Sequence, residues 1–134
     1  MIAITIPFKT PSVNHLYGRH GKCTFIKKEG KLLRQQIQVI CAEQLADVDL
    51  EPYRNCPLQV ITRITENWYT KSGTIYRKDI KNRSKFLIDS VFNAIYIEDS
   101  HIWNDLMYKE HTDSGECKAV VEISRMDKGG GILI

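Results

Sequence analysis

The spacing of apolar residues changes several times along the chain, and each change marks a predicted element. Residues 1–6 alternate strongly apolar positions up to Pro7, which predicts a short strand. Between residues 29 and 46 the apolar side chains recur every three or four positions, which predicts an amphipathic helix. Residues 58–65 are rich in β-branched side chains and predict another strand, the longest of the sheet.

A second helical pattern covers residues 79–95. Asp79 stands at its start and is a good N-cap, because its carboxylate can accept a hydrogen bond from the amide of Lys81 or Asn82. The apolar stripe of this helix is Leu87, Ile88, Val91, Phe92 and Ile95. The opposite, polar face is Asn82, Lys85, Asp89 and Asn93. Phe86 falls on the polar side, where an aromatic residue is not expected.

Two further strands, residues 101–111 and 118–124, flank a turn and predict a hairpin, in which Ile102, Leu106 and Tyr108 face inward. The order strand, helix, strand, helix, strand, strand predicts an α+β fold with a small mixed four-stranded sheet and two main helices. The stretch from Pro7 to about Lys28 has no sustained period and predicts a long irregular loop, of a kind that is often functional.

The chain of 134 residues is 43% hydrophobic, which fits one domain, residues 1–125, followed by a flexible Gly-rich tail, residues 126–134. No apolar run approaches the roughly 20 residues that span a bilayer, and no secretory leader is recognisable, so we expect a cytoplasmic protein without membrane contacts. The four cysteines contain no CxxC pair, and we expect reduced thiols.

The net charge is only +3, but basic residues gather in residues 7–40 and 68–85 while residues 98–127 are acidic. This distribution favours an anionic polymer on one face; the alternative is a solvated surface of uneven charge. The residues expected to contact DNA are Asn14, Tyr17, Arg19, Lys22, Lys27, Lys28, Lys71, Arg77, Lys78, Lys81, Asn82 and Phe86. Four aromatic side chains are candidates for a wedge into the bases: Tyr17, Trp68, Tyr69 and Phe86.

Carboxylates bracket the second helix. Asp79 precedes it and Asp99 follows it, with Glu98 beside Asp99, so these oxygens could hold a hard cation such as Mg²⁺ against a phosphate. Lys85, two turns into the helix, could neutralise charge that develops on the phosphate. The alternative is a helix-capping aspartate and an ordinary acidic turn. A zinc site is not favoured, because His20 and Cys23 have no second pair at similar spacing.

Three motifs in this order resemble the RusA family of Holliday junction resolvases. The segment 79–85 is similar to the family motif Asp-x-Asp-Asn-x-x-Lys at Asp79, Asn82 and Lys85, and Asp89 fits a frequent aspartate within the helix. The segment 98–102 resembles the terminal motif Asp-Asp-x-Gln-(Ile/Val), with Glu98 and His101 as replacements. The segment 11–17 is similar to Pro-Ser-x-Asn-x-x-Tyr.

The resemblance implies a RusA-like domain that cuts branched DNA with Mg²⁺, for which Mn²⁺ can substitute. It assigns metal binding to Asp79, Asp99 and Glu98, and catalysis to Asp79, Asp99 and Lys85. It also implies a homodimer in a bacterial or phage-infected cell, since a two-fold substrate is matched by a two-fold dimer. Lys81 departs from the pattern, because it stands where the family has its second metal-binding aspartate. The alternative is therefore a weakly active or inactive protein that binds junctions.

Overall fold

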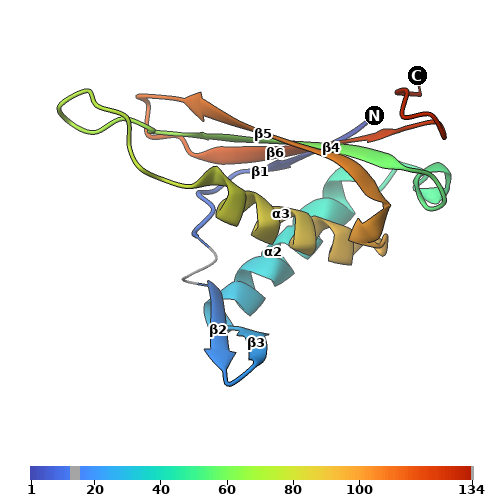
Figure 1. Cartoon of the computed structure of the whole chain (residues 1–134), viewed down its shortest axis with the longest axis horizontal. Helices are drawn as coiled ribbons and strands as arrows, with labels where there is room; N and C mark the ends of the chain where they lie inside the picture. The colour runs from blue at the N-terminus through green and yellow to red at the C-terminus, as the bar shows by residue number, and fades with distance from the viewer. Residues whose placement is uncertain (13–15, 134) are drawn as a thin grey trace.

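The computed structural model describes residues 1–12 and 16–133, which form two layers. One layer is a four-stranded sheet in the order β1-β6-β4-β5, and the other consists of helices α2 and α3 on one face of it (Figure 1). The elements are β1 (Ile2–Ile6), α2 (Lys28–Gln44), β4 (Leu58–Glu66), α3 (Ile80–Ile95), β5 (Ile102–His111) and β6 (Lys118–Arg125). The predicted α+β fold and its order of main elements are confirmed. The predicted hairpin of the last two strands is wrong, because β4 lies between β5 and β6 in the sheet, and β5, not β4, is the longest strand.

Helix α3 lies at the centre of the core. It packs against α2 on one side and against β5 on the other, so side chains all around its axis are buried. Its N-cap is Asp79, whose Oδ1 accepts a hydrogen bond from the amide of Lys81 at 2.9 Å, as predicted. Phe86 is fully buried, with its ring edge-on to Tyr17 at a centroid distance of 6.3 Å. The prediction that Phe86 contacts DNA is therefore wrong, because α3 has neighbours on both sides.

Strand β5 pairs in parallel with β4 and contains a bulge. Leu58 pairs with Ile102, but Gln59 pairs with Asn104, so Trp103 is an extra residue in the ladder. An extra residue shifts the two-residue alternation of side chains by one position. Beyond it, Asp105 and Met107 turn toward α3. The prediction that Leu106 and Tyr108 face inward is wrong for this reason, and these side chains are 39% and 45% exposed.

The N-terminal stretch predicted to be an irregular loop contains a second, two-stranded sheet. Strands β2 (Tyr17–His20) and β3 (Cys23–Ile26) form a hairpin, which projects from the body near the start of α2 (Figure 1). Its turn contains Gly21 at φ +61°, a conformation that glycine adopts without strain. Phe25 packs over Gly18, where a side chain would collide with the ring.

A second projection, two short turns and the C-terminal tail complete the described chain. Residues 67–79 form a second projection, closed by a bridge between Tyr69 and Ile75 (Figure 1). Short 3₁₀ turns, η1 (Glu51–Tyr53) and η2 (Asp99–His101), precede β4 and β5. The Gly-rich tail, predicted to be flexible, turns back through a bridge between Met126 and Ile132. Among the helices of the described residues, none is long and apolar enough to cross a membrane.

Candidate active site

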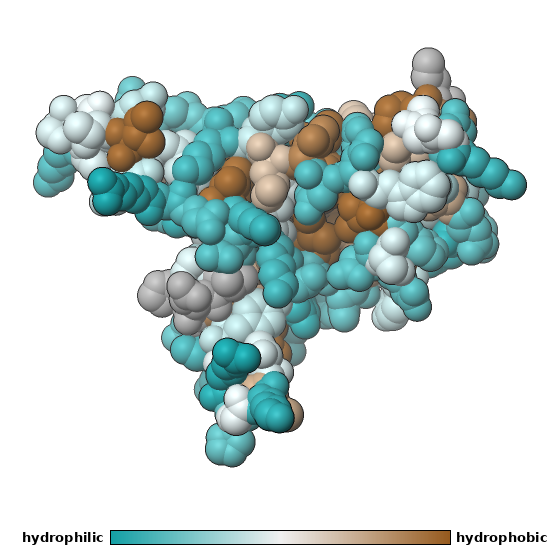
Figure 2. All heavy atoms as spheres, viewed as in Figure 1, coloured by the Kyte–Doolittle hydropathy of each residue, from teal (hydrophilic) through white to brown (hydrophobic). Residues whose placement is uncertain are grey.

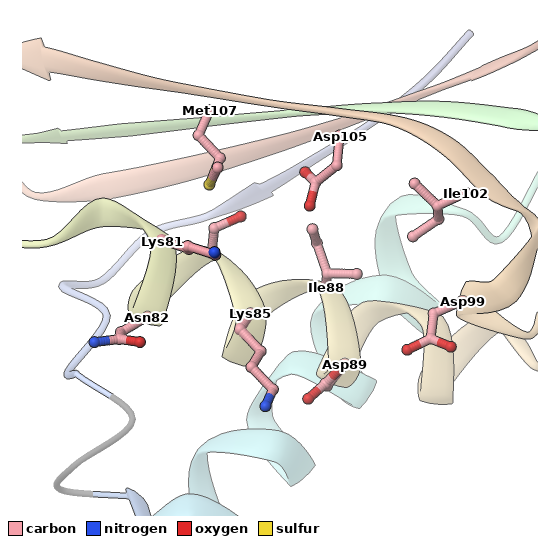
Figure 3. Close-up of a pocket in the computed structure, with 10 residues that line it drawn as sticks. Lys81, Asn82, Lys85, Ile88, Asp89, Asp99, Ile102, Asp105 and Met107 are labelled. Atoms are coloured by element: carbon pink, nitrogen blue, oxygen red, sulfur yellow. The ribbon is translucent and has the colours of Figure 1, made fainter.

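A groove of about 540 Å³ runs between α3 and the edge strand β5. Helix α3 supplies Lys81, Lys85 and Asp89 at steps of four residues, which places them on one face. Asp99 enters the groove from η2, and Asp105 enters it from β5 beyond the bulge (Figure 3). The groove therefore combines three carboxylates with two lysine side chains.

Asp89 and Asp99 form an acid pair, and both side chains also line a second pocket on the other side of α3. Burial raises the pKa of the Asp89 carboxyl, and the negative charge of Asp99 raises it further. The positive charges of Lys85 and Arg34 act in the opposite direction. Like charges held this close make the acid pair a favourable place for a cation.

The hydroxyl of Tyr17 connects the N-terminal hairpin to this acid pair. It donates a long hydrogen bond of 3.4 Å to Asp89 Oδ2 and accepts one of 3.0 Å from Nη2 of Arg34. Burial, followed by the charge of Asp89, raises the pKa of Tyr17, so the hydroxyl stays a proton donor at neutral pH. Tyr17, predicted to contact DNA, is thus half-buried and holds a carboxylate of the site.

Asp79 and Asp99 are not brought together. Ten residues of α3 separate Asp79 from Asp89, which is about 15 Å along a helix axis. Asp99 lies near Asp89, toward the C-terminal end of α3 (Figure 3). Carboxylates that share one ion lie within about 2.6 Å of it. Asp89 therefore takes the place beside Asp99 that the sequence assigned to Asp79.

The remaining carboxylates differ in position. Glu98 is exposed, accepts a hydrogen bond from Ser100 at 3.3 Å and lines only the second pocket. Asp105 was not recognised in the sequence as a site residue, because the bulge that turns it inward has no signal in the apolar pattern. No cluster of three or more acidic, His or Cys side chains in the described parts of the chain is close enough to hold a metal alone.

Other residues predicted to contact DNA lie at the edges of this site. Lys81, Asn82 and Lys85 line the groove. The exposed basic residues of the two projections and of the start of α2 are Arg19, Lys22, Lys27, Lys28, Lys71 and Arg77. Figure 2 shows teal side chains on both projections, next to white ones and, on the upper-left projection, a brown patch, while most brown atoms lie over the body. Asn14 lies outside the described residues.

A buried ion-pair cluster fixes the N-terminal end of α3. Glu66, only 1% exposed, accepts hydrogen bonds from Arg83 and from Lys78, the latter at 3.1 Å. Trp68 is 3% exposed, and its indole N–H donates to two backbone carbonyls. Lys78 is therefore engaged in this cluster rather than free for DNA, and a wedge of Trp68 into bases is excluded in this conformation. Tyr69 remains exposed.

A mixed two-layer domain with an acid pair in an open groove and basic projections is compatible with an enzyme that cuts DNA strands internally, an endodeoxyribonuclease. Residues 7–124 match the family model of endodeoxyribonuclease RusA, and the chain belongs to this family. The resemblance described from the three motifs is thereby confirmed. Membership implies endonuclease activity on Holliday junctions. No curated protein matches the chain significantly.

Proposed function

We propose that this protein is a divalent-metal-dependent endonuclease that resolves four-way DNA junctions as a homodimer. The observation that carries the proposal is the acid pair Asp89–Asp99 next to Lys85 in an open groove. A groove of this kind admits a phosphodiester backbone, and its mixed charges suit both a cation and a phosphate.

The residues of the groove fit a hard divalent cation. Mg²⁺ is commonly held by one or two carboxylates together with phosphate oxygens and water, so a cage of three protein ligands is not required. Asp89 and Asp99 would supply the carboxylates, and Mn²⁺ has the same preference for oxygen. When bound, the metal polarises a phosphate and lowers the pKa of an attacking water.

The chain's own residues have separable tasks. Tyr17 orients the Asp89 carboxylate through its hydroxyl. Lys85 lies in the groove close enough to Asp89 to lower the pKa of that carboxyl, so its ammonium can stabilise negative charge on the phosphate. Asp79 caps α3 and fixes the position of the helix that carries Lys81, Lys85 and Asp89. The basic projections supply contacts to the DNA backbone, which are largely independent of sequence.

The test is cleavage of a synthetic four-way junction in Mg²⁺ or Mn²⁺. Asp99→Asn should reduce the cleavage rate by at least about 100-fold, because one charged ligand of the pair is lost, while junction binding measured in EDTA persists. Asp47→Asn is the matched control, since it makes the same change at an exposed carboxylate that lines neither the groove nor the second pocket. Cleavage by Asp99→Asn at the wild-type rate would rule out the assignment of the acid pair.

A second candidate function is junction binding without cutting. Lys81 supports it, because its positive charge in the groove opposes the binding of a second cation. If the natural chain does not cut and Lys81→Asp does, this second function is the correct one. If the natural chain cuts the junction and Lys81→Asp does not cut it faster, the endonuclease proposal stands.

A further inference from the structure

The second pocket, on the far side of the acid pair, is not used by the mechanism above. It measures about 580 Å³, and its walls include Tyr17, Arg34, Asp89, Tyr96 and Asp99. Because Asp89 and Asp99 line both this pocket and the groove, the acid pair stands at the boundary between them. A DNA strand that runs from the groove across the acid pair would place its next nucleotide in this pocket.

Arg34 is the cation of this pocket. Its Nη2 donates to Tyr17, but its Nε is buried and has no hydrogen-bond partner in the described residues. Arg34 also forms no ion pair with a carboxylate there. A guanidinium that is not matched by a carboxylate is suited to a phosphate, because its remaining N–H groups can donate charge-assisted hydrogen bonds to phosphate oxygens.

Basic side chains lead to Arg34 along α2. Lys27 precedes the helix, Lys31 follows four residues later and Arg34 three residues after that, which is the spacing of one helical face. This row starts at the base of the β2–β3 hairpin and ends at the acid pair. It therefore gives the backbone of a bound strand a continuous positive path to the pocket.

Tyr96 supplies an aromatic surface at the same pocket. Its side chain is 86% exposed, and its backbone has φ +57°, in the left-handed region that few non-glycine residues adopt. Arg54 Nη1 donates to the carbonyls of Ile95 and Tyr96 at 3.2 and 3.1 Å, which fixes this helix end. An exposed ring on a fixed backbone is a suitable platform for a nucleobase.

We propose that this pocket binds the nucleotide next to the scissile phosphate, with its phosphate on Arg34 and its base on Tyr96. This inference rests on the proposed function, because it takes the acid pair as the place of cleavage. It adds a binding subsite and two residues, neither of which is in the RusA motifs described above.

The test measures junction binding by fluorescence anisotropy in EDTA over a series of salt concentrations, so that no metal and no cleavage are involved. Arg34→Met should weaken binding about 10-fold or more and reduce the slope of log K against log[salt] by roughly 0.7 to 0.9, the value for one phosphate. Arg34→Lys should restore the slope but not the full affinity, because lysine has no planar fork. Lys128→Met, in the C-terminal tail, is the control for removing one positive charge and should keep the slope.

Two further variants separate the subsite from a structural effect. Tyr17→Phe removes the hydrogen bond to Arg34 but keeps its charge, so the slope should not change. Tyr96→Ala should weaken binding about 5- to 10-fold with an unchanged slope, since stacking releases no counterions. Its control is Tyr108→Ala, an exposed tyrosine on the opposite face of the sheet, which should bind as the wild type.

A wild-type slope in Arg34→Met, or equal affinities of Tyr96→Ala and Tyr108→Ala, would overturn the proposed subsite. The outcome is separable from that of the proposed function. If Arg34→Met has a reduced slope but the wild type never cuts junctions, the subsite is supported and the endonuclease proposal is refuted. If the wild type cuts junctions and Arg34→Met has an unchanged slope, the endonuclease proposal is supported and the subsite is refuted.

Discussion

Asp105 faces α3 from the edge strand, and partial burial raises the pKa of its carboxyl. The fold therefore disfavours the charged form of this side chain relative to the unfolded chain. Because the folded pKa is the higher one, stability falls as the pH rises from the ordinary carboxyl value through the raised one, and stays lower above it. The charged Asp105 carboxylate therefore lowers the stability of the fold at neutral pH. Side chains with perturbed pKa values of this kind are common at functional sites.

Asp105→Asn should accordingly be more stable than the wild type at pH 7, and this gain should shrink as the pH falls and be small at pH 3.5, where the aspartate is mostly protonated in both states. Thermal unfolding at pH 3.5 and pH 7 measures the difference. Asp47→Asn, at an exposed position outside the groove, should change stability at neither pH. A loss of stability in Asp105→Asn at pH 7 would show that its charge is favourable in the fold.

Glu66 shows the opposite behaviour, since its buried charge is matched by Arg83 and Lys78. Glu66→Gln should lower the free energy of unfolding by about 3 to 5 kcal/mol, because it leaves Arg83 buried without its partner. Glu122→Gln breaks the more exposed pair with Arg63 and should cost much less, because solvent screens that pair. Urea denaturation measures both, and equal losses would contradict the difference in burial.

At the scale of elements, the β2–β3 hairpin carries Arg19 and Lys22 away from the core. Both side chains are exposed, so their charge is available to a bound partner and takes no part in the packing of the core. The hairpin is joined to the body at Leu16, which is fully buried and whose carbonyl accepts from the amide of Lys27 at 2.7 Å. The hairpin is thus a fixed support for the charges that it presents.

The double variant Arg19→Glu/Lys22→Glu should weaken junction binding strongly, by about 10- to 100-fold at low salt, with little change in melting temperature. Its matched control is Lys118→Glu/Lys128→Glu, which makes the same change of net charge at two exposed positions outside the hairpin. The same loss of affinity in the control would mean that net charge alone decides binding. A loss of melting temperature in the double variant would mean that the hairpin charges also stabilise the fold.

The main helices and the four strands of the sheet could be predicted because their apolar patterns are sustained, as in α3 with its N-cap at Asp79. The short strands β2 and β3 could not, because they bury few apolar side chains. Phe86 could not be placed, since a helix pattern does not reveal that α2 and Tyr17 cover its second side. The acid pair was only half predicted. Asp99 was identified because carboxylates bracket the second helix. Its partner was taken to be Asp79, although a straight helix of 16 residues separates Asp79 from the turn that carries Asp99. Arg34 was also missed, because its position outside the apolar stripe is that of any solvated residue.

At the scale of the whole molecule, one subunit contains one acid pair in the described residues, while a four-way junction has two symmetry-related strands to cut. In the proposed homodimer the two-fold axis of the protein coincides with that of the junction. Each subunit then places its groove on one strand, and the two cuts occur within one complex.

Paired cutting has a measurable result on a supercoiled plasmid that extrudes a cruciform. The wild type should convert it directly to linear DNA, whereas a dimer with one Asp99→Asn subunit should stop at the nicked circle. Gel analysis of the time course distinguishes the two products, and the wild-type homodimer mixed with the inactive homodimer after assembly is the control. Accumulation of nicked circles by the wild type would speak against a dimer that acts on both strands.

Trp103 has a consequence for how this chain should be compared with its relatives. As the extra residue in the ladder, it reverses which side chains face α3 in the part of β5 that follows it. A relative with one residue fewer at this point would direct the equivalents of Leu106 and Tyr108 at α3, and an apolar layer would fill the space that Asp105 now opens. Insertion or deletion of one residue at this point can therefore convert the groove into ordinary protein interior. When β5 is aligned with a relative that lacks the bulge, the alignment should be shifted by one position after Ile102 before the equivalent of Asp105 is judged present or missing.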